Sequence, residues 1–187
     1  MSSAALWYLS RATGLVSFVV LSLVVVLGTT VGRKGKIPGL PRFAGVGLHR
    51  NAALFAVVLL VIHIGTAVMD PFVTIGLVSA IVPFTSGYEP LWLGLGALAI
   101  DLTAAVVVTS LLRFRIGIKA WRAVHWLAYA VWPLAAIHGI GAAADLRSGV
   151  MLDVVLATIA GVLVAIAVRV LGMASTKPRP RPVTQGS

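Results

Sequence analysis

The sequence has no cysteine and very few charged residues. Asp, Glu, Lys and Arg together make up only 11% of its 187 residues. Without cysteine the chain can form no disulfide bond, no iron–sulfur cluster and no thiolate-ligated haem. The formal net charge is +10, a value often seen in nucleic-acid-binding proteins. Here, however, the basic residues lie in short segments beside apolar runs, so we expect no nucleic-acid partner.

The shortage of charge leaves long apolar runs. Hydrophobic residues make up 59% of the chain and the mean hydropathy is +1.04. Several runs reach the roughly 18 apolar residues that indicate a membrane-spanning helix, and they do not alternate as barrel strands would. The sequence therefore predicts an all-α polytopic membrane protein whose bundle of five transmembrane helices covers about residues 15–31, 48–69, 91–112, 121–141 and 150–173.

Three segments lie outside these spans. We expect residues 1–14 to form an extracytoplasmic segment, with the first span retained because it lacks the basic region and cleavage pattern of a signal peptide. The apolar residues 72–84 are too few to cross a membrane, which predicts an interfacial cap. Residues 174–187 are polar and rich in proline, which predicts a disordered cytoplasmic tail.

Basic residues mark one side of the expected bundle. In a five-span arrangement, 13 of the 15 basic residues fall on the same side, and Arg11 and Arg147 fall on the other. Because basic loops stay in the cytoplasm, this pattern places the N-terminus outside and the C-terminus in the cytoplasm of a multi-pass protein of the plasma membrane, most simply a bacterial cytoplasmic membrane. The basic side is also suited to contact anionic membrane lipid.

The chain has only four histidines, and they form two pairs. His49 and His63 belong to the second expected span, and His125 and His138 to the fourth. The intervals of 14 and 13 residues each correspond to roughly 20 Å along a helix, so each histidine of one span has a counterpart at a similar height in the other. Thirteen residues leave the second pair about 100° short of the rotation that 14 give, and Pro133 between them could shift the helical register.

Paired imidazoles at matched heights point to two haem groups. A single histidine in a membrane helix is most often a packed polar residue, but two matched pairs are harder to explain by packing, since ionisable groups in hydrocarbon are costly. Zinc fits less well, because each pair lacks the further ligands that tetrahedral coordination needs. A haem with two axial histidines needs only two imidazoles from facing helices. The remaining alternative is a haem-free helical scaffold whose histidines bridge helices.

The strings LHRN, WRAVHWLAY and IHGIG, together with the two intervals, resemble the ferric reductase-like transmembrane domain. This family includes eukaryotic ferric reductases, NADPH oxidases and the haem-bearing membrane subunit of periplasmic methionine sulfoxide reductase. The resemblance covers about residues 12–172. It implies a haem-binding transmembrane domain over residues 15–173 with two haem b groups, the inner iron ligated by His49 and His125 and the outer by His63 and His138. Unlike NADPH oxidases, the chain has only a short polar stretch after the last span and no G-x-G-x-x-G motif, so we expect no self-contained NAD(P)H site.

A few further residues are candidates for the same site. Arg50 and Arg122 lie beside the inner histidines and could pair with haem propionates, although topology anchoring explains them equally well. Trp132 lies between His125 and His138 and could assist electron transfer, although aromatic packing is the simpler explanation. Asp101 is the one carboxylate in the middle of a span, with either a structural or a proton-transfer role. Small residues near the histidines could admit a porphyrin: Gly45, Gly47, Gly139 and Gly141.

The expected function is electron transfer by the membrane haem subunit of an oxidoreductase. Because two histidines occupy both axial positions of each iron, the haems would pass electrons rather than bind oxygen. The donor would be a cytoplasmic flavin reductase or membrane quinol, and the acceptor an extracytoplasmic redox protein or ferric iron. A quinone-coupled cytochrome b, which also holds two haems between paired histidines, remains an alternative.

Overall fold

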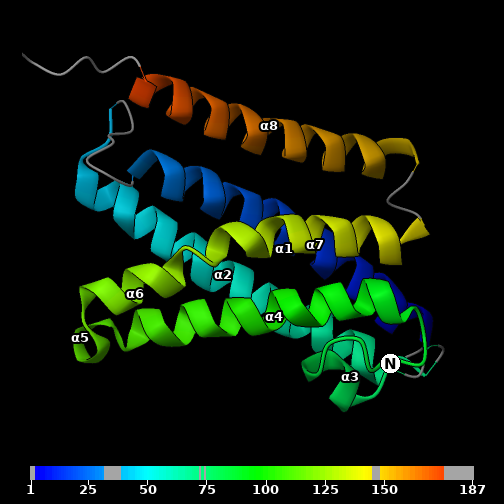
Figure 1. The fold of residues 1–187 in the computed structure, drawn as a ribbon. Coiled ribbons are helices and arrows are strands. Elements are labelled where there is room, and N and C mark those ends of the chain that lie inside the picture. Colours follow the sequence, from blue (N-terminus) through cyan, green and yellow to red (C-terminus); the bar gives the residue numbers. More distant parts are fainter. Residues whose placement is uncertain (1–2, 32–38, 72, 74, 145–147, 175–187) are drawn as a thin grey trace, which may run out of the picture.

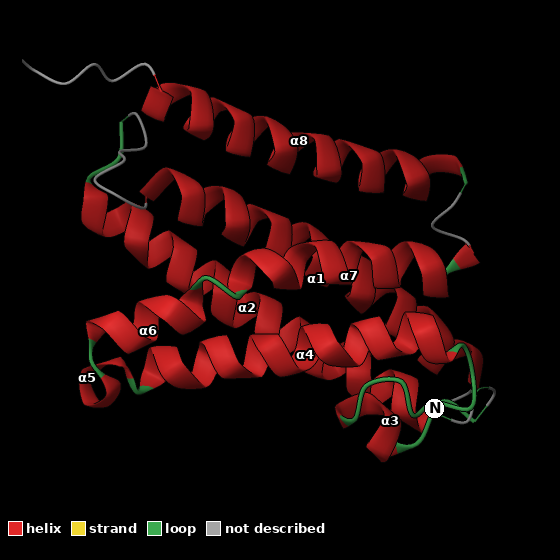
Figure 2. Ribbon diagram, viewed as in Figure 1, coloured by secondary structure: helices red, strands yellow, loops and turns green. Residues whose placement is uncertain are grey.

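Every element of the computed structural model is helical over the residues that it describes, which are 3–31, 39–71, 73, 75–144 and 148–174 (Figures 1 and 2). The expected tail from residue 175 onward and Phe72, the first residue of the expected cap, lie outside this part of the chain. The helices are α1 (Ser3–Val31), α2 (Arg42–Met69), α3 (Leu77–Ile81), α4 (Pro90–Leu111), α5 (Arg113–Ile116), α6 (Ile118–His125), α7 (Ala128–Ala142) and α8 (Gly149–Ala174).

Five helical segments are long and apolar enough to cross a membrane. They are Ala4–Val31, Arg42–Met69, Pro90–Leu111, Ile118–Ala142 and Gly149–Leu171. The fourth segment is built from two helices, α6 and α7, in succession. The prediction of an all-α membrane protein with five spanning helices is thus confirmed.

The first helix extends well beyond the expected span. α1 begins at Ser3 rather than near residue 15, and its 29 residues correspond to about 43 Å. The hydrocarbon core of a bilayer is only about 30 Å thick, so α1 is long enough to line the bundle from one membrane surface to the other. Ser10, Arg11 and Gly14, which were expected to precede the first span, therefore belong to a helix that packs along α2.

The helices form two packed pairs, α1 with α2 and α4 with α7 (Figure 1). α1 also packs against α7 and α8, so it lies at the centre of the bundle, whereas α8 contacts chiefly α1 on the outside. Among the described residues α2 packs mainly on α1, with a small contact to α3, and has no comparable backbone contact with α6 or α7. The helices that carry the histidines therefore face each other without packing backbone to backbone.

The short helix α3 covers one end of the bundle by packing on α4. Phe84, just after this helix, adopts a positive φ of 65°, and its ring fills the space beside Gly94 of α4. A Cβ atom at residue 94 would clash with the Phe84 ring, so glycine is required for this contact. We call this end of the molecule the cap end.

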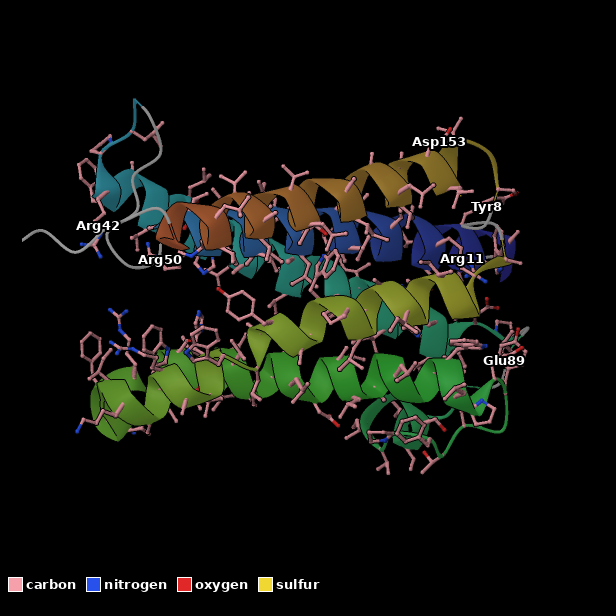
Figure 3. All side chains as sticks on the ribbon, turned by 45° about the horizontal axis from the view of Figure 1, so that its top comes forward. Tyr8, Arg11, Arg42, Arg50, Glu89 and Asp153 are labelled. Carbon is pink, nitrogen blue, oxygen red and sulfur yellow. The ribbon has the colours of Figure 1, made fainter. Side chains whose placement is uncertain are left out.

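The opposite end carries the described basic residues of α2, α5, α6 and the last turns of α8, and we call it the basic end. Figure 3 shows Arg42 and Arg50 at this end, whereas Tyr8, Arg11, Glu89 and Asp153 lie at the cap end. Of the expected basic cluster, Arg33, Lys34 and Lys36 lie outside the described residues.

A short overwound turn separates α6 from α7. The backbone N–H groups of Leu127, Tyr129 and Ala130 bond to carbonyls three residues earlier, at 2.8 to 3.1 Å. Such 3₁₀ geometry turns about 120° and rises about 2.0 Å per residue, against 100° and 1.5 Å in an α-helix. Three such residues recover roughly 60° of the missing rotation and lengthen the 13-residue interval to roughly the 21 Å of the 14-residue one. The register change thus lies before Pro133, not at the proline itself.

Candidate haem-binding site

The structure brings the four histidines together as two pairs from facing helices. The ring centres of His49 on α2 and His125 on α6 are 6.4 Å apart with an interplanar angle of 72°. The ring centres of His63 on α2 and His138 on α7 are also 6.4 Å apart, with an angle of 73°. We call the first the basic-end pair and the second the cap-end pair. Two independent pairs therefore share one geometry.

The separation within each pair fits two axial ligands of one iron. Metal–imidazole bonds are roughly 2 Å long, so two of them take up about 4 Å of the distance between ring centres. The remainder leaves about 1.2 Å for each ring, which is close to the distance from an imidazole centre to its nitrogen. The described residues contain no cluster of three or more His, Cys, Asp or Glu. A porphyrin supplies four further ligands of its own, so two histidines are a sufficient protein donor set for haem.

Three of the four imidazoles are oriented by a backbone carbonyl of a neighbouring helix. The Nδ1 of His63 lies 2.8 Å from the Ser10 oxygen, that of His138 2.8 Å from the Trp92 oxygen, and that of His49 3.1 Å from the Val24 oxygen. Because a carbonyl only accepts, each of these Nδ1 atoms must donate, which leaves Nε2 with its lone pair. This is the arrangement that metal-ligating histidines usually show.

A glycine lies four residues after each of these carbonyls. A Cβ on Gly14 would lie 2.9 Å from the His63 ring, a Cβ on Gly28 3.2 Å from the His49 ring, and a Cβ on Gly96 2.7 Å from the His138 ring. In an α-helix the carbonyl of residue i points toward residue i+4, so a side chain there would block the imidazole. The absence of Cβ at these three positions is therefore part of the site.

Of the glycines expected beside the histidines, Gly47 and Gly141 have no contact with a histidine ring. A Cβ at Gly47 would meet nothing within 4 Å, and one at Gly141 would meet Trp92 rather than a histidine. The glycines next to the rings lie on α1 and α4, the helices that pack against α2 and α7. The signal that could have found two of them is the interval between Gly14 and Gly28, which equals the interval between His49 and His63.

An apolar cavity of about 110 Å³ lies beside the cap-end pair. Aliphatic side chains from α1, α2, α4 and α7 form most of its wall, and His63 and His138 line it directly. Ser79 and Ala80 of α3 complete the lining, so the cap closes this cavity. An apolar space against two imidazoles is the environment that a porphyrin plane needs.

The aromatic residue expected between the two pairs, Trp132, is held in place by two residues of α1. Trp132 of α7 is buried, and its Nε1 donates to the Ser22 Oγ of α1 at 2.7 Å. Its ring stacks on Phe18, with ring centres 6.0 Å apart. By residue count Trp132 lies about midway between His125 and His138, roughly 10 Å along the axis from each.

Three arginines lie near the two ends of the site. Arg50 and Arg122 are exposed at the basic end and make no hydrogen bond or ion pair with the described residues. Arg11, which was not expected in the site, lies one helical turn before Gly14 and interacts electrostatically with both His63 and His138. Its guanidinium also donates to the Ala142 oxygen at 3.3 Å, which links α1 to the end of α7.

Asp101 lies apart from the histidine pairs. It occupies the middle of α4, is half-buried, and does not line the cavity beside the cap-end pair. Within the part of the chain that the structure describes, its carboxyl makes no hydrogen bond or ion pair. The structure thus gives Asp101 no contact with the site.

A search of the curated proteins and a search of the solved structures found no match to this chain. A family model did match: the ferric reductase like transmembrane component matches residues 13–136, which is more than half of the chain. The matched region includes His49, His63 and His125, and His138 lies two residues beyond its end. The chain therefore belongs to the ferric reductase-like transmembrane family, whose domain carries electrons across a membrane.

Proposed function

We propose that this protein holds two haem b groups and passes electrons between them across the membrane, as the haem subunit of an oxidoreductase. His49 and His125 would ligate the haem at the basic end, and His63 and His138 the haem at the cap end. The observation that carries the proposal is the pair of matching 6.4 Å separations between facing imidazoles. Bound haem supplies one-electron oxidation and reduction at its iron.

The other residues of the chain orient and separate the two groups. The carbonyls of Ser10, Val24 and Trp92 fix the tautomer and the plane of three ligands. Arg50 and Arg122 supply cations for propionates at the basic end, and Arg11 supplies one at the cap end. Trp132, held by Ser22, places an aromatic ring between the pairs, where it shortens the through-space part of the electron path.

Charge sets the proposed direction of transfer. The basic end would face the cytoplasm by the positive-inside rule, in a bacterial cytoplasmic membrane, and the cap end would face outward. Moving an electron outward across an inside-negative membrane is favoured by about 2.3 kcal/mol per 100 mV. The donor would be a cytoplasmic flavoprotein or membrane quinol that docks at the basic end, and the acceptor an extracytoplasmic redox protein or ferric iron.

Haem content of the purified protein tests this proposal. We expect a b-type reduced-minus-oxidised spectrum and two haems per chain by pyridine haemochrome assay. His63→Ala should lower the content to about one haem per chain, because only the cap-end pair loses a ligand. Gly65→Ala, on the same helix and with open space around its new Cβ, is the matched control and should keep both. Colourless wild-type protein from haem-replete cells would instead support the haem-free scaffold.

A further inference from the structure

The contacts that orient the four histidines follow a repeat with one exception. On α1, the carbonyl and glycine that receive His63 are Ser10 and Gly14, and those that receive His49 are Val24 and Gly28, 14 residues further on. On α4, the carbonyl and glycine that receive His138 are Trp92 and Gly96. The same 14-residue step along α4 leads to Val106 and Ser110.

The fourth position therefore carries a serine where the other three carry glycine. The Ser110 side chain stands where glycine leaves room for the other three imidazoles, and its hydroxyl donates to the Val106 carbonyl at 2.6 Å. His125 accordingly finds no such acceptor. Its Nδ1 is buried and has no hydrogen-bond partner among the residues that the structure describes.

A tryptophan occupies the place of the missing contact. The ring of Trp121, one turn before His125 on α6, stacks on the imidazole with centres 4.9 Å apart and an interplanar angle of 27°. The Trp121 Nε1 donates in turn to the Ser110 Oγ at 3.2 Å. The orientation of His125 is thus fixed through a chain of contacts from Ser110 to Trp121 to the imidazole.

We propose that Trp121, anchored by Ser110, is the positioning residue for His125, and that this substitute contact gives the basic-end haem the higher potential of the two. The proposal rests on the di-haem function above. A hydrogen bond donated from Nδ1 makes an imidazole a more basic ligand, which stabilises the more highly charged ferric iron. Both ligands of the cap-end pair donate such bonds, whereas only His49 does so in the basic-end pair.

Charge acts in the opposite direction. Arg11 interacts electrostatically with both cap-end histidines, whereas the exposed Arg50 and Arg122 show no such interaction with His49 or His125. Positive charge disfavours the ferric state, so Arg11 raises the potential of the cap-end haem. The proposed order therefore rests on the missing Nδ1 hydrogen bond of His125, whose effect we take to be the larger.

Spectroelectrochemical titration of the purified holoprotein tests the order of potentials. Wild type should show two waves, and His63→Ala should retain only the higher one. Retention of the lower wave would overturn the assignment. Haem content measured on the same wild-type sample separates this failure from a failure of the di-haem function, because wild type without haem would refute that function instead.

Variants of the contact chain test the positioning role. Trp121→Ala should shift the higher wave and broaden the low-spin EPR signal of one haem only, leaving the lower wave in place, and Trp121→Phe should restore most of the wild-type signal because it keeps the stacking. Trp126→Ala is the matched control, since this exposed ring contacts Tyr129 and not His125.

Ser110→Gly provides a second variant should Trp121→Ala not accumulate. It removes the side chain that stands beside the Val106 carbonyl and recreates the glycine of the other three positions, while the Thr109 hydroxyl remains on that carbonyl as the Thr13 hydroxyl does on the Ser10 carbonyl. The higher wave should then move toward the lower one. Wild-type potentials and EPR spectra in both Trp121→Ala and Ser110→Gly would show that neither residue positions His125.

Discussion

At the scale of single residues, the site depends on glycines, which have no Cβ atom, as well as on the imidazoles. The four histidines were predictable because they are the only ones in the chain and because their intervals match. Gly14, Gly28 and Gly96 were not identified, because their role depends on which helices pack against α2 and α7. The exception at His125 was equally hidden, since it arises only where α4 and α6 meet.

Adding a single methyl group at a glycine that touches a ring should displace one haem. In Gly96→Ala the new Cβ would lie 2.7 Å from the His138 Nδ1, in the path of its hydrogen bond to the Trp92 carbonyl. We expect content to fall toward one haem per chain, with the basic-end haem retained.

The same substitution should by itself stabilise the helix, because alanine is about 1 kcal/mol more favourable than glycine inside a helix. Gly161→Ala on α8, where a Cβ meets nothing within 4 Å, is therefore the control and should keep two haems and equal or greater thermal stability. Equal haem content in the two variants would contradict a steric role for Gly96.

At the scale of elements, the sequence of the fourth span indicated that extra helical rotation was needed between His125 and His138, but it pointed to Pro133 as the place. The 13-residue interval between His125 and His138 demanded extra rotation, and Pro133 was the visible irregularity. The structure supplies about 60° of this rotation in the 3₁₀ turn from Trp126 to Ala130. A proline removes the N–H that would bond four residues back and crowds that carbonyl, here of Tyr129. Pro133 thus favours irregular hydrogen bonding in the residues just before it, where the 3₁₀ turn lies.

Replacing Pro133 with alanine should therefore affect the basic-end pair more than the cap-end pair. The restored N–H at residue 133 can bond the Tyr129 carbonyl and favours regular α-helix through the turn, which rotates His125 away from His49. We expect partial loss of the basic-end haem, seen as a smaller higher-potential wave, while the cap-end haem stays at full occupancy. Uniform loss of both haems would indicate general destabilisation and contradict the local role of the turn.

At the scale of the whole molecule, the two ends of the bundle differ in a way that bears on its orientation. The membrane-spanning character followed from composition, because five long apolar runs have no other stable environment. Arg42 and Arg50 of α2 lie at the end away from α3 (Figure 3), and α5 and α6, which carry further basic residues, lie at the same end (Figure 1). Hydropathy cannot give the packing order, in which α1 rather than a histidine-bearing helix is central, because it records how apolar each span is and not which spans pack together.

Orientation in the membrane can be read directly because the chain has no cysteine. Single cysteines can be placed at Gly87, near the cap and with open space for a side chain, and at the exposed Lys119 of α6. If the basic end faces the cytoplasm, a membrane-impermeant maleimide added to intact cells should label Gly87→Cys at once and Lys119→Cys only after permeabilisation. Cysteine-free wild type measures the background in both conditions. Labelling of Lys119→Cys in intact cells would reverse the proposed direction of electron transfer, while the two histidine pairs and their order across the membrane would be unaffected.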